Sequence, residues 1–96
     1  MNKSRRKELC AVADKLILLN KVGNDIDEAD LDAIKSELES ILYDEESYMD
    51  NMPENFQSGC RYQAAEEACN NIEYAIDALD DSNIDDAISY IYGATV

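Results

Sequence analysis

The chain has 96 residues, of which 46% are hydrophobic and 31% charged, and its formal net charge is −14 at neutral pH. This length suits one domain rather than two, and the apolar content is enough for a folded core and too high for a disordered chain. With three Gly, one Pro and no long apolar run, the composition excludes a low-complexity chain and disfavours a membrane protein.

Charge is distributed unevenly along the chain. Residues 1–22 carry six basic and two acidic side chains, whereas residues 23–96 carry twenty acidic side chains and only Lys35 and Arg61 as basic ones. Such asymmetry predicts two parts that meet different partners or attract each other. Because most of the surface would repel phosphates, direct non-specific binding to nucleic acid is disfavoured.

The first predicted helix spans residues 4–22. Ser4 is a suitable N-cap and Gly23 a suitable stop. Apolar residues recur at three and four positions along it: Leu9, Val12, Ala13, Leu16 and Leu19. Asp14 and Lys15 interrupt this stretch, which therefore does not read as a signal peptide, so we expect a cytoplasmic protein.

The second predicted helix, residues 26–51, has the clearest pattern. A heptad seam steps by three and four through Leu31, Ile34, Leu38, Ile41, Glu45, Tyr48 and Met52. Only Glu45 breaks the apolar rule. Acidic residues gather at the start of this helix, where the helix dipole favours negative charge.

Residues 52–59 form the main break, because Pro53 disfavours helical geometry at Met52. A third helix is predicted over residues 59–92, with a stripe of Ala65, Ala68, Cys69, Ile72, Ala75, Ile76 and Leu79. The phase of the stripe drifts after Leu79. Either the helix continues past residues 80–83 with a changed contact face, or Ser82 caps a short fourth helix.

These elements predict an all-α fold in one domain of residues 1–96. Small side chains on the third helix let the second approach closely, which favours an antiparallel hairpin of these two helices, with the first completing a three-helix bundle. If the third helix is continuous, the apolar residues Ile84, Ile88, Ile91 and Tyr92 overhang the bundle and face water. We therefore expect a homo-oligomer that buries them.

Nothing in the sequence predicts catalysis or a metal. The chain has no His, no Gly-rich phosphate loop and no nucleophile elbow. The calcium-loop pattern at Asp81, Asn83 and Asp85 fails, because Asp86 replaces the required Gly and Tyr92 the required Glu. The three cysteines, too few for a zinc site of about four ligands, are interpreted as small core-compatible side chains in a reducing compartment. We expect neither enzymatic activity nor a cofactor.

The up-down-up topology would bring the start of the first helix to the loop before the third. Arginine side chains and helix N-termini together suit phosphate, and Phe56, Tyr62 and Tyr48 could stack on a base. The candidate ligand-binding residues are Arg5, Arg6, Phe56, Gln57, Arg61 and Tyr62. Two plainer interpretations stay open: Arg61 could pair with Glu54 or Glu66, and Phe56 could belong to the core.

Residues 48–57 (YMDNMPENFQ), followed by Arg61, Tyr62 and an Ala/Glu-rich heptad helix, resemble small coiled-coil proteins of phages and prophages in Firmicutes-type bacteria. The basic residues 3–9 are similar to the same group. Small helical phage proteins include oligomeric sponges for the signalling nucleotides of bacterial immunity and acidic inhibitors of CRISPR effectors. The resemblance implies a counter-defence role inside a bacterial host cell.

The leading functional hypothesis is a homo-oligomer that sequesters a cyclic or linear signalling nucleotide at its bundle ends. The first alternative is an acidic nucleic-acid mimic that binds a basic host protein such as a CRISPR effector. The second alternative is a structural coiled-coil adaptor without a ligand.

Overall fold

The computed structural model of the chain describes residues 2–22, 27–56 and 59–95. Within these ranges lie the helices α1 (Lys3–Val22), α2 (Glu28–Asp50), α3 (Cys60–Asp80) and α4 (Ile84–Ala94), with a short 3-10 helix η1 (Glu54–Phe56) between α2 and α3. No strand occurs in the described ranges. The predicted all-helical class is therefore confirmed.

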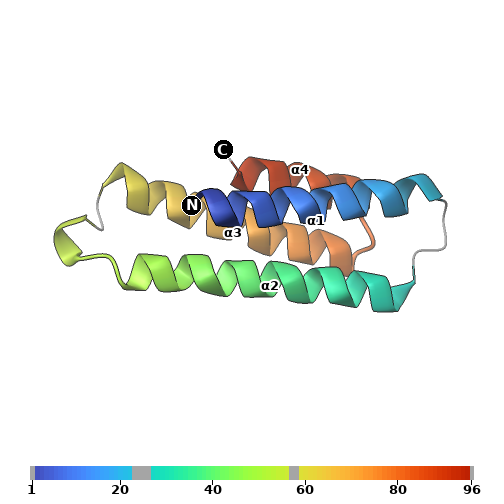
Figure 1. Cartoon of the computed structure of the whole chain (residues 1–96), viewed down its shortest axis with the longest axis horizontal. Coiled ribbons are helices and arrows are strands. Elements are labelled where there is room, and N and C mark those ends of the chain that lie inside the picture. Colours follow the sequence, from blue (N-terminus) through green and yellow to red (C-terminus); the bar gives the residue numbers. More distant parts are fainter. Residues whose placement is uncertain (1, 23–26, 57–58, 96) are drawn as a thin grey trace.

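The four described α-helices run up, down, up and down along a rod of 49 × 22 × 20 Å (Figure 1). Helix α3 contacts α2 and α4, and α1 also contacts α2 and α4. The predicted hairpin of α2 and α3 is present. The expected three-helix bundle is corrected, because residues 84–94 turn back as a fourth helix.

The turn between α3 and α4 settles the question that the sequence left open. Ser82 has a φ of 59°, a left-handed conformation that ends α3. The N-cap of α4 is Asn83 and not Ser82, because the Asn83 side chain accepts a hydrogen bond from the backbone N–H of Asp86. The chain therefore reverses direction at this turn. Of the two expectations, the short fourth helix is confirmed and the continuous third helix is not.

This reversal buries the apolar residues that were expected to overhang. Ile84 and Ile91 are buried, and Ile88 is half-buried against the same core, while only Tyr92 stays exposed. The expectation that all four face water was wrong, since α4 lies against α1 and α3. These residues therefore no longer predict a homo-oligomer.

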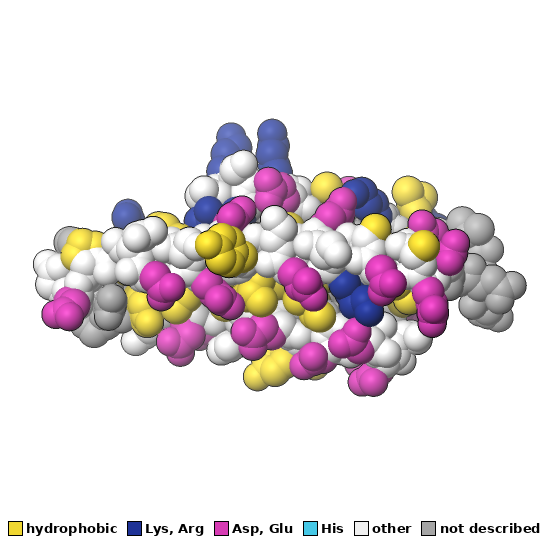
Figure 2. Space-filling view, turned by 90° about the horizontal axis from the view of Figure 1, so that it is seen from below, with side chains coloured by type: hydrophobic (Ala, Val, Ile, Leu, Met, Phe, Trp, Pro, Cys, Tyr) yellow, Lys and Arg dark blue, Asp and Glu magenta, His cyan; other side chains and the backbone are white. Residues whose placement is uncertain are grey.

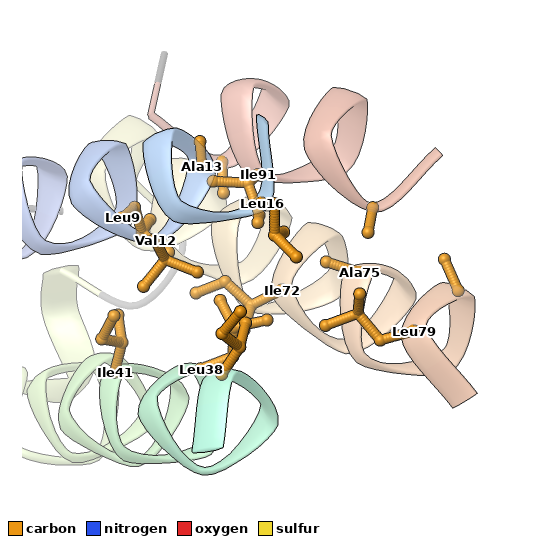
Figure 3. Close-up of a cluster of buried hydrophobic side chains, with 14 of the residues drawn as sticks. Leu9, Val12, Ala13, Leu16, Leu38, Ile41, Ile72, Ala75, Leu79 and Ile91 are labelled. Atoms are coloured by element: carbon orange, nitrogen blue, oxygen red, sulfur yellow. The ribbon is translucent and has the colours of Figure 1, made fainter. Parts of the chain in front are cut away.

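The core is a column of aliphatic side chains from all four described α-helices. Figure 3 shows core side chains from each of these helices, among them Leu9 and Leu16 of α1, Leu38 of α2, Ile72 of α3 and Ile91 of α4. These five side chains are fully buried. The seam predicted on α2 is buried from Leu31 to Glu45, and the buried alanines of α3 allow the close approach expected of them: Ala65, Ala68 and Ala75.

Polar side chains fix the starts of α1 and α2. The Asn2 side chain accepts a hydrogen bond of 2.8 Å from the backbone N–H of Arg5, so Asn2, and not Ser4, serves the first turn of α1. Asp27 is the N-cap of α2 and accepts from the N–H of Ala29. Helix α1 ends at Val22 as expected, while the predicted stop at Gly23 lies outside the described residues.

Candidate functional site

Of the α-helices that the structure describes, only α2 and α3 reach one end of the bundle. In Figure 1, α2 and α3 extend beyond the start of α1 and the end of α4. Arg5 of α1 pairs with Glu45 of α2, and Gly93 of α4 lies against Asn71 of α3. We call residues 46–54 and 59–66, which lie past these contacts, the open end.

A buried ion pair holds the start of α1 against this end. The Nε of Arg5 donates to a carboxylate oxygen of Glu45 at 2.6 Å, with 14% of the Arg5 side chain exposed and none of the Glu45 side chain. The Arg5 guanidinium also lies 5.5 Å from the ring centre of Tyr48. The polar interruption of the heptad seam is thus explained, because Glu45 receives a cation from α1 where the other seam positions receive apolar side chains.

Two cavities lie side by side at the open end. The larger, of about 610 Å³, is lined by Tyr48, Asn51, Met52, Pro53, Gly59, Cys60 and Arg61. The smaller, of about 290 Å³, is lined by Asn2, Arg6, Tyr48, Arg61 and Ala64. Since Tyr48 and Arg61 line both, the two cavities form one surface, which we call the Arg61 groove.

The guanidinium groups of this groove face solvent. Arg6 and Arg61 are exposed, and neither forms an ion pair with any residue that the structure describes. In particular, Arg61 does not pair with Glu54 or Glu66, the plainer interpretation that the sequence left open. Neither guanidinium group donates a hydrogen bond to another described residue, so their N–H donors can bind an anionic group.

The structure separates the six candidate residues into three groups. Arg6 and Arg61 line the same small cavity, as the topology argument expected. Arg5 lies beside them, but its Nε is used by Glu45, so it positions α1. Tyr62 is half-buried and lines neither cavity, while the side chain of Phe56 and the whole of Gln57 lie outside the described residues.

Sequence reasoning named Tyr48 as a residue that could stack on a base, but it missed the other apolar residues of the groove, Met52 and Cys60. Met52 and Tyr48 are the last members of the α2 seam, and Cys60 opens α3. The signal for them was the length of the seam. It extends past Glu45, the partner of Arg5, so its last two members, Tyr48 and Met52, lie at the open end.

The three cysteines differ in burial. Cys10 and Cys60 are exposed, so their interpretation as core side chains was wrong; Cys69 is buried beside Met49, with 3.7 Å between the two sulfur atoms. Burial, with added repulsion from the carboxylates of Glu45, Glu46 and Glu73, raises the pKa of Cys69 to about 12. Cys69 is therefore a thiol of the interior and no nucleophile at neutral pH.

Other features of the described residues carry no comparable site. No group of three or more Cys, Asp and Glu side chains in the described ranges is arranged to hold a metal ion. None of the described helices is both long enough and apolar enough to cross a membrane. No family model, no curated protein and no solved structure matches the chain. The Arg61 groove is therefore the candidate functional site among the described residues.

Proposed function

We propose that this protein is a non-enzymatic binding protein that holds an anionic, nucleotide-type ligand in the Arg61 groove. The supporting observation is that Tyr48 and Arg61 line both cavities, so one surface connects the apolar wall at Met52 to the guanidinium of Arg6. A nucleotide has the same two parts. Its base would lie in the larger cavity against Tyr48 and Met52, and its phosphate between Arg6 and Arg61.

The large negative charge of the protein favours a small anion over a long polyanion as the ligand. Acidic side chains are spread along the face seen in Figure 2, while most Lys and Arg side chains lie along one edge of that view. Charges farther apart than about 8 Å are largely screened at physiological salt. A small phosphate ester in the groove would thus feel the two guanidinium groups most strongly, whereas a long polyanion would also meet the carboxylates.

Binding without conversion would lower the free concentration of the ligand. For a protein similar to small phage helical proteins, the corresponding role is to sequester a signalling nucleotide of host immunity. We include this role in the proposal on the strength of the resemblance of residues 48–57, Arg61 and Tyr62.

The test is thermal unfolding of the purified protein with a panel of cyclic and linear nucleotides, followed by titration calorimetry of any that bind. A ligand at a hundredfold excess over its Kd stabilises the folded state by about 2.7 kcal/mol. Arg61→Ala should weaken binding about ten- to hundredfold, since hydrogen bonds to charged groups contribute about 1.5–3 kcal/mol.

Lys21→Ala is the matched control. It removes the same single positive charge from an exposed position in the last turn of α1, far from the open end (Figure 1). It should leave the Kd unchanged. Equal binding by Arg61→Ala and the native protein would refute the assignment of the groove.

A second candidate is an acidic protein that occupies a basic protein surface. It is favoured by α2, whose only cation, Lys35, is engaged by Asp32 at 3.3 Å and Asp80 at 2.8 Å, while Glu39, Asp44 and Asp50 are exposed. The nucleotide panel separates the candidates. A panel without any shift in melting temperature would favour this second function.

A further inference from the structure

A second groove lies between α1 and α2. It consists of two cavities, of about 360 Å³ and about 340 Å³, and Lys15 of α1 and Glu37 of α2 line both of them. From these two residues the first cavity continues toward the start of α1 and the second toward its end, along two antiparallel helices (Figure 1). We call the surface formed by residues 8–19 of α1 and 30–41 of α2 the α1–α2 groove. It shares no lining residue with the Arg61 groove.

Two stripes of side chains, one on each helix, form the sides of this groove. The α1 stripe is Glu8, Ala11, Lys15 and Leu18. The α2 stripe is Asp30, Ala33, Glu37 and Ser40. Both follow a spacing of three, four and three, which keeps each stripe on one side of its helix, next to the face that packs into the core. The small side chains of Ala11, Ala33 and Ser40 leave the surface hollow between the two helices.

The groove has an apolar floor and an apolar residue on its rim. Val12 and Ile34, both buried members of the core, line the floor, and Leu18 on the rim is 63% exposed. Residues 8–19 extend over roughly 17 Å at about 1.5 Å per residue, which is about three turns of a helix. A further helix of that length lying between α1 and α2 would remove this apolar surface from water, and its side chains would fit into the hollow as in other helix packings.

The charged side chains of the groove favour a cationic partner. Glu8 and Asp30 are exposed, and neither forms an ion pair with another described residue. Among the described residues that line the groove, Lys15 is the only cation, and it is engaged by Glu37 at 2.7 Å. Three carboxylates therefore surround one ammonium group. A basic segment would be attracted to this groove, and an acidic one would be repelled.

One oxygen of Glu37 offers a specific polar contact. Its Oε1 accepts from Lys15, but its Oε2 is buried and accepts no hydrogen bond from any described residue. Buried polar atoms are nearly always hydrogen-bonded. The Glu37 side chain as a whole is 43% exposed, and the last torsion of a Glu side chain is soft, so the carboxylate can turn Oε2 toward a donor in the groove. The side chains of Lys and Arg supply such N–H donors.

We propose that the α1–α2 groove docks a basic amphipathic helix of a partner protein. The apolar side chains of that helix would cover Ala11, Leu18 and Ala33, and a Lys or Arg beside them would donate to Oε2 of Glu37. This inference goes beyond the nucleotide function, because the two grooves have no residue in common. It also gives the second candidate function a defined contact surface, with a helix as the element that is bound.

A synthetic helical peptide of leucine and lysine is the probe. Its leucines stand at positions i, i+3, i+4 and i+7, which gives the peptide one apolar face and one basic face. A scrambled peptide of the same composition, without an apolar face, is the control. In fluorescence anisotropy at about 0.15 M salt, the native protein should bind the amphipathic peptide at least about tenfold more tightly than the scrambled one, because only the former can cover the floor of the groove.

Two pairs of variants locate the binding. Ala33→Lys puts a positive charge into the groove and should weaken peptide binding at least about tenfold. Gln63→Lys adds the same charge at an exposed position of α3 that lines neither groove, and it should have little effect. Glu37→Gln should weaken binding about two- to fivefold, as expected for a partly exposed charge pair. Its matched control is Glu39→Gln, because Glu39 is exposed and does not line the groove.

The outcomes separate the groove from the overall charge of the protein. Equal binding by Ala33→Lys and Gln63→Lys, or equal binding of the two peptides, would overturn the inference and leave the exposed carboxylates of α2 as the surface of the second candidate function. Failure of the native protein to bind the amphipathic peptide would overturn it as well. Ala33→Lys should leave nucleotide binding unchanged, so the groove and the nucleotide function can fail independently.

Discussion

Replacing Arg5 by alanine removes a cation that lies 2.6 Å from the carboxylate of Glu45, whose side chain is fully buried. Removing one partner of a buried ion pair destabilises the folded state, by up to about 3–5 kcal/mol where the remaining charge is left uncompensated, because that charge has lost its hydration. The free energy of unfolding of a small domain is on the order of 5–15 kcal/mol. The melting temperature should fall by roughly 4–8 °C for each kcal/mol lost in a chain of this size, and by clearly more than in a variant that breaks an exposed ion pair.

Lys15→Ala is the matched control for this prediction. It breaks the pair between Lys15 and Glu37, which has nearly the same length, 2.7 Å, but leaves the two side chains 53% and 43% exposed. An exposed pair contributes about 0–1 kcal/mol. Urea unfolding followed by far-UV circular dichroism at pH 7 gives both values.

The double variant Arg5→Met with Glu45→Leu extends the test. It replaces the buried pair by apolar side chains of similar size and should recover much of the lost stability. Losses of similar size in Arg5→Ala and Lys15→Ala would refute the reasoning that burial decides the cost.

Three further predictions concern the interior and the α3–α4 turn. In the native protein at pH 8, Cys10 and Cys60 should react quickly with a thiol reagent and Cys69 only on unfolding, because burial raises the pKa of Cys69 to about 12; three fast thiols would contradict its burial. Since the unfolded thiol ionises near its ordinary value of 9.0, the folded state should also lose stability as the pH rises from about 9 toward 12. Ser82→Gly should raise the melting temperature by about 2–4 °C, since it relieves about 0.5 kcal/mol of strain at a φ of 59°. An unchanged or lower value, set against Ser82→Ala as the control, would show that the turn is not strained.

The sequence predicted most of the secondary structure because helical signals are local. The seam on α2 and the stripes on α1 and α3 report which face of each helix is buried, and Pro53 marks the break between α2 and α3. The caps were less certain. Ser4 and Ser82 are plausible N-caps by residue type, but Asn2 and Asn83 hold these roles, since the choice depends on backbone angles that neighbouring residues share.

The candidate site was predicted only in part, from the expected order and direction of the helices. Up-down-up topology was sufficient to bring Arg6 and Arg61 together. It could not distinguish Arg5 from Arg6, which are adjacent in the sequence but lie on different sides of α1. The polar Glu45 in an apolar seam indicated that a cation would be buried beside it, but the sequence pattern did not indicate which residue would supply that cation.

Periodicity therefore determined the helical class, the buried faces and the approximate bounds of α1, α2 and the start of α3. Only the tertiary structure decided that the chain reverses at Ser82 and that Ile84 and Ile91 join the core. It also decided that Arg5 forms an ion pair with Glu45 while Arg61 stays exposed. The physical reason is that apolar residues spaced by three and four indicate that one face of a helix is buried, but they do not indicate which other helix packs against that face. The covering partner is chosen by the packing of whole helices, whose contacts join residues far apart in the sequence.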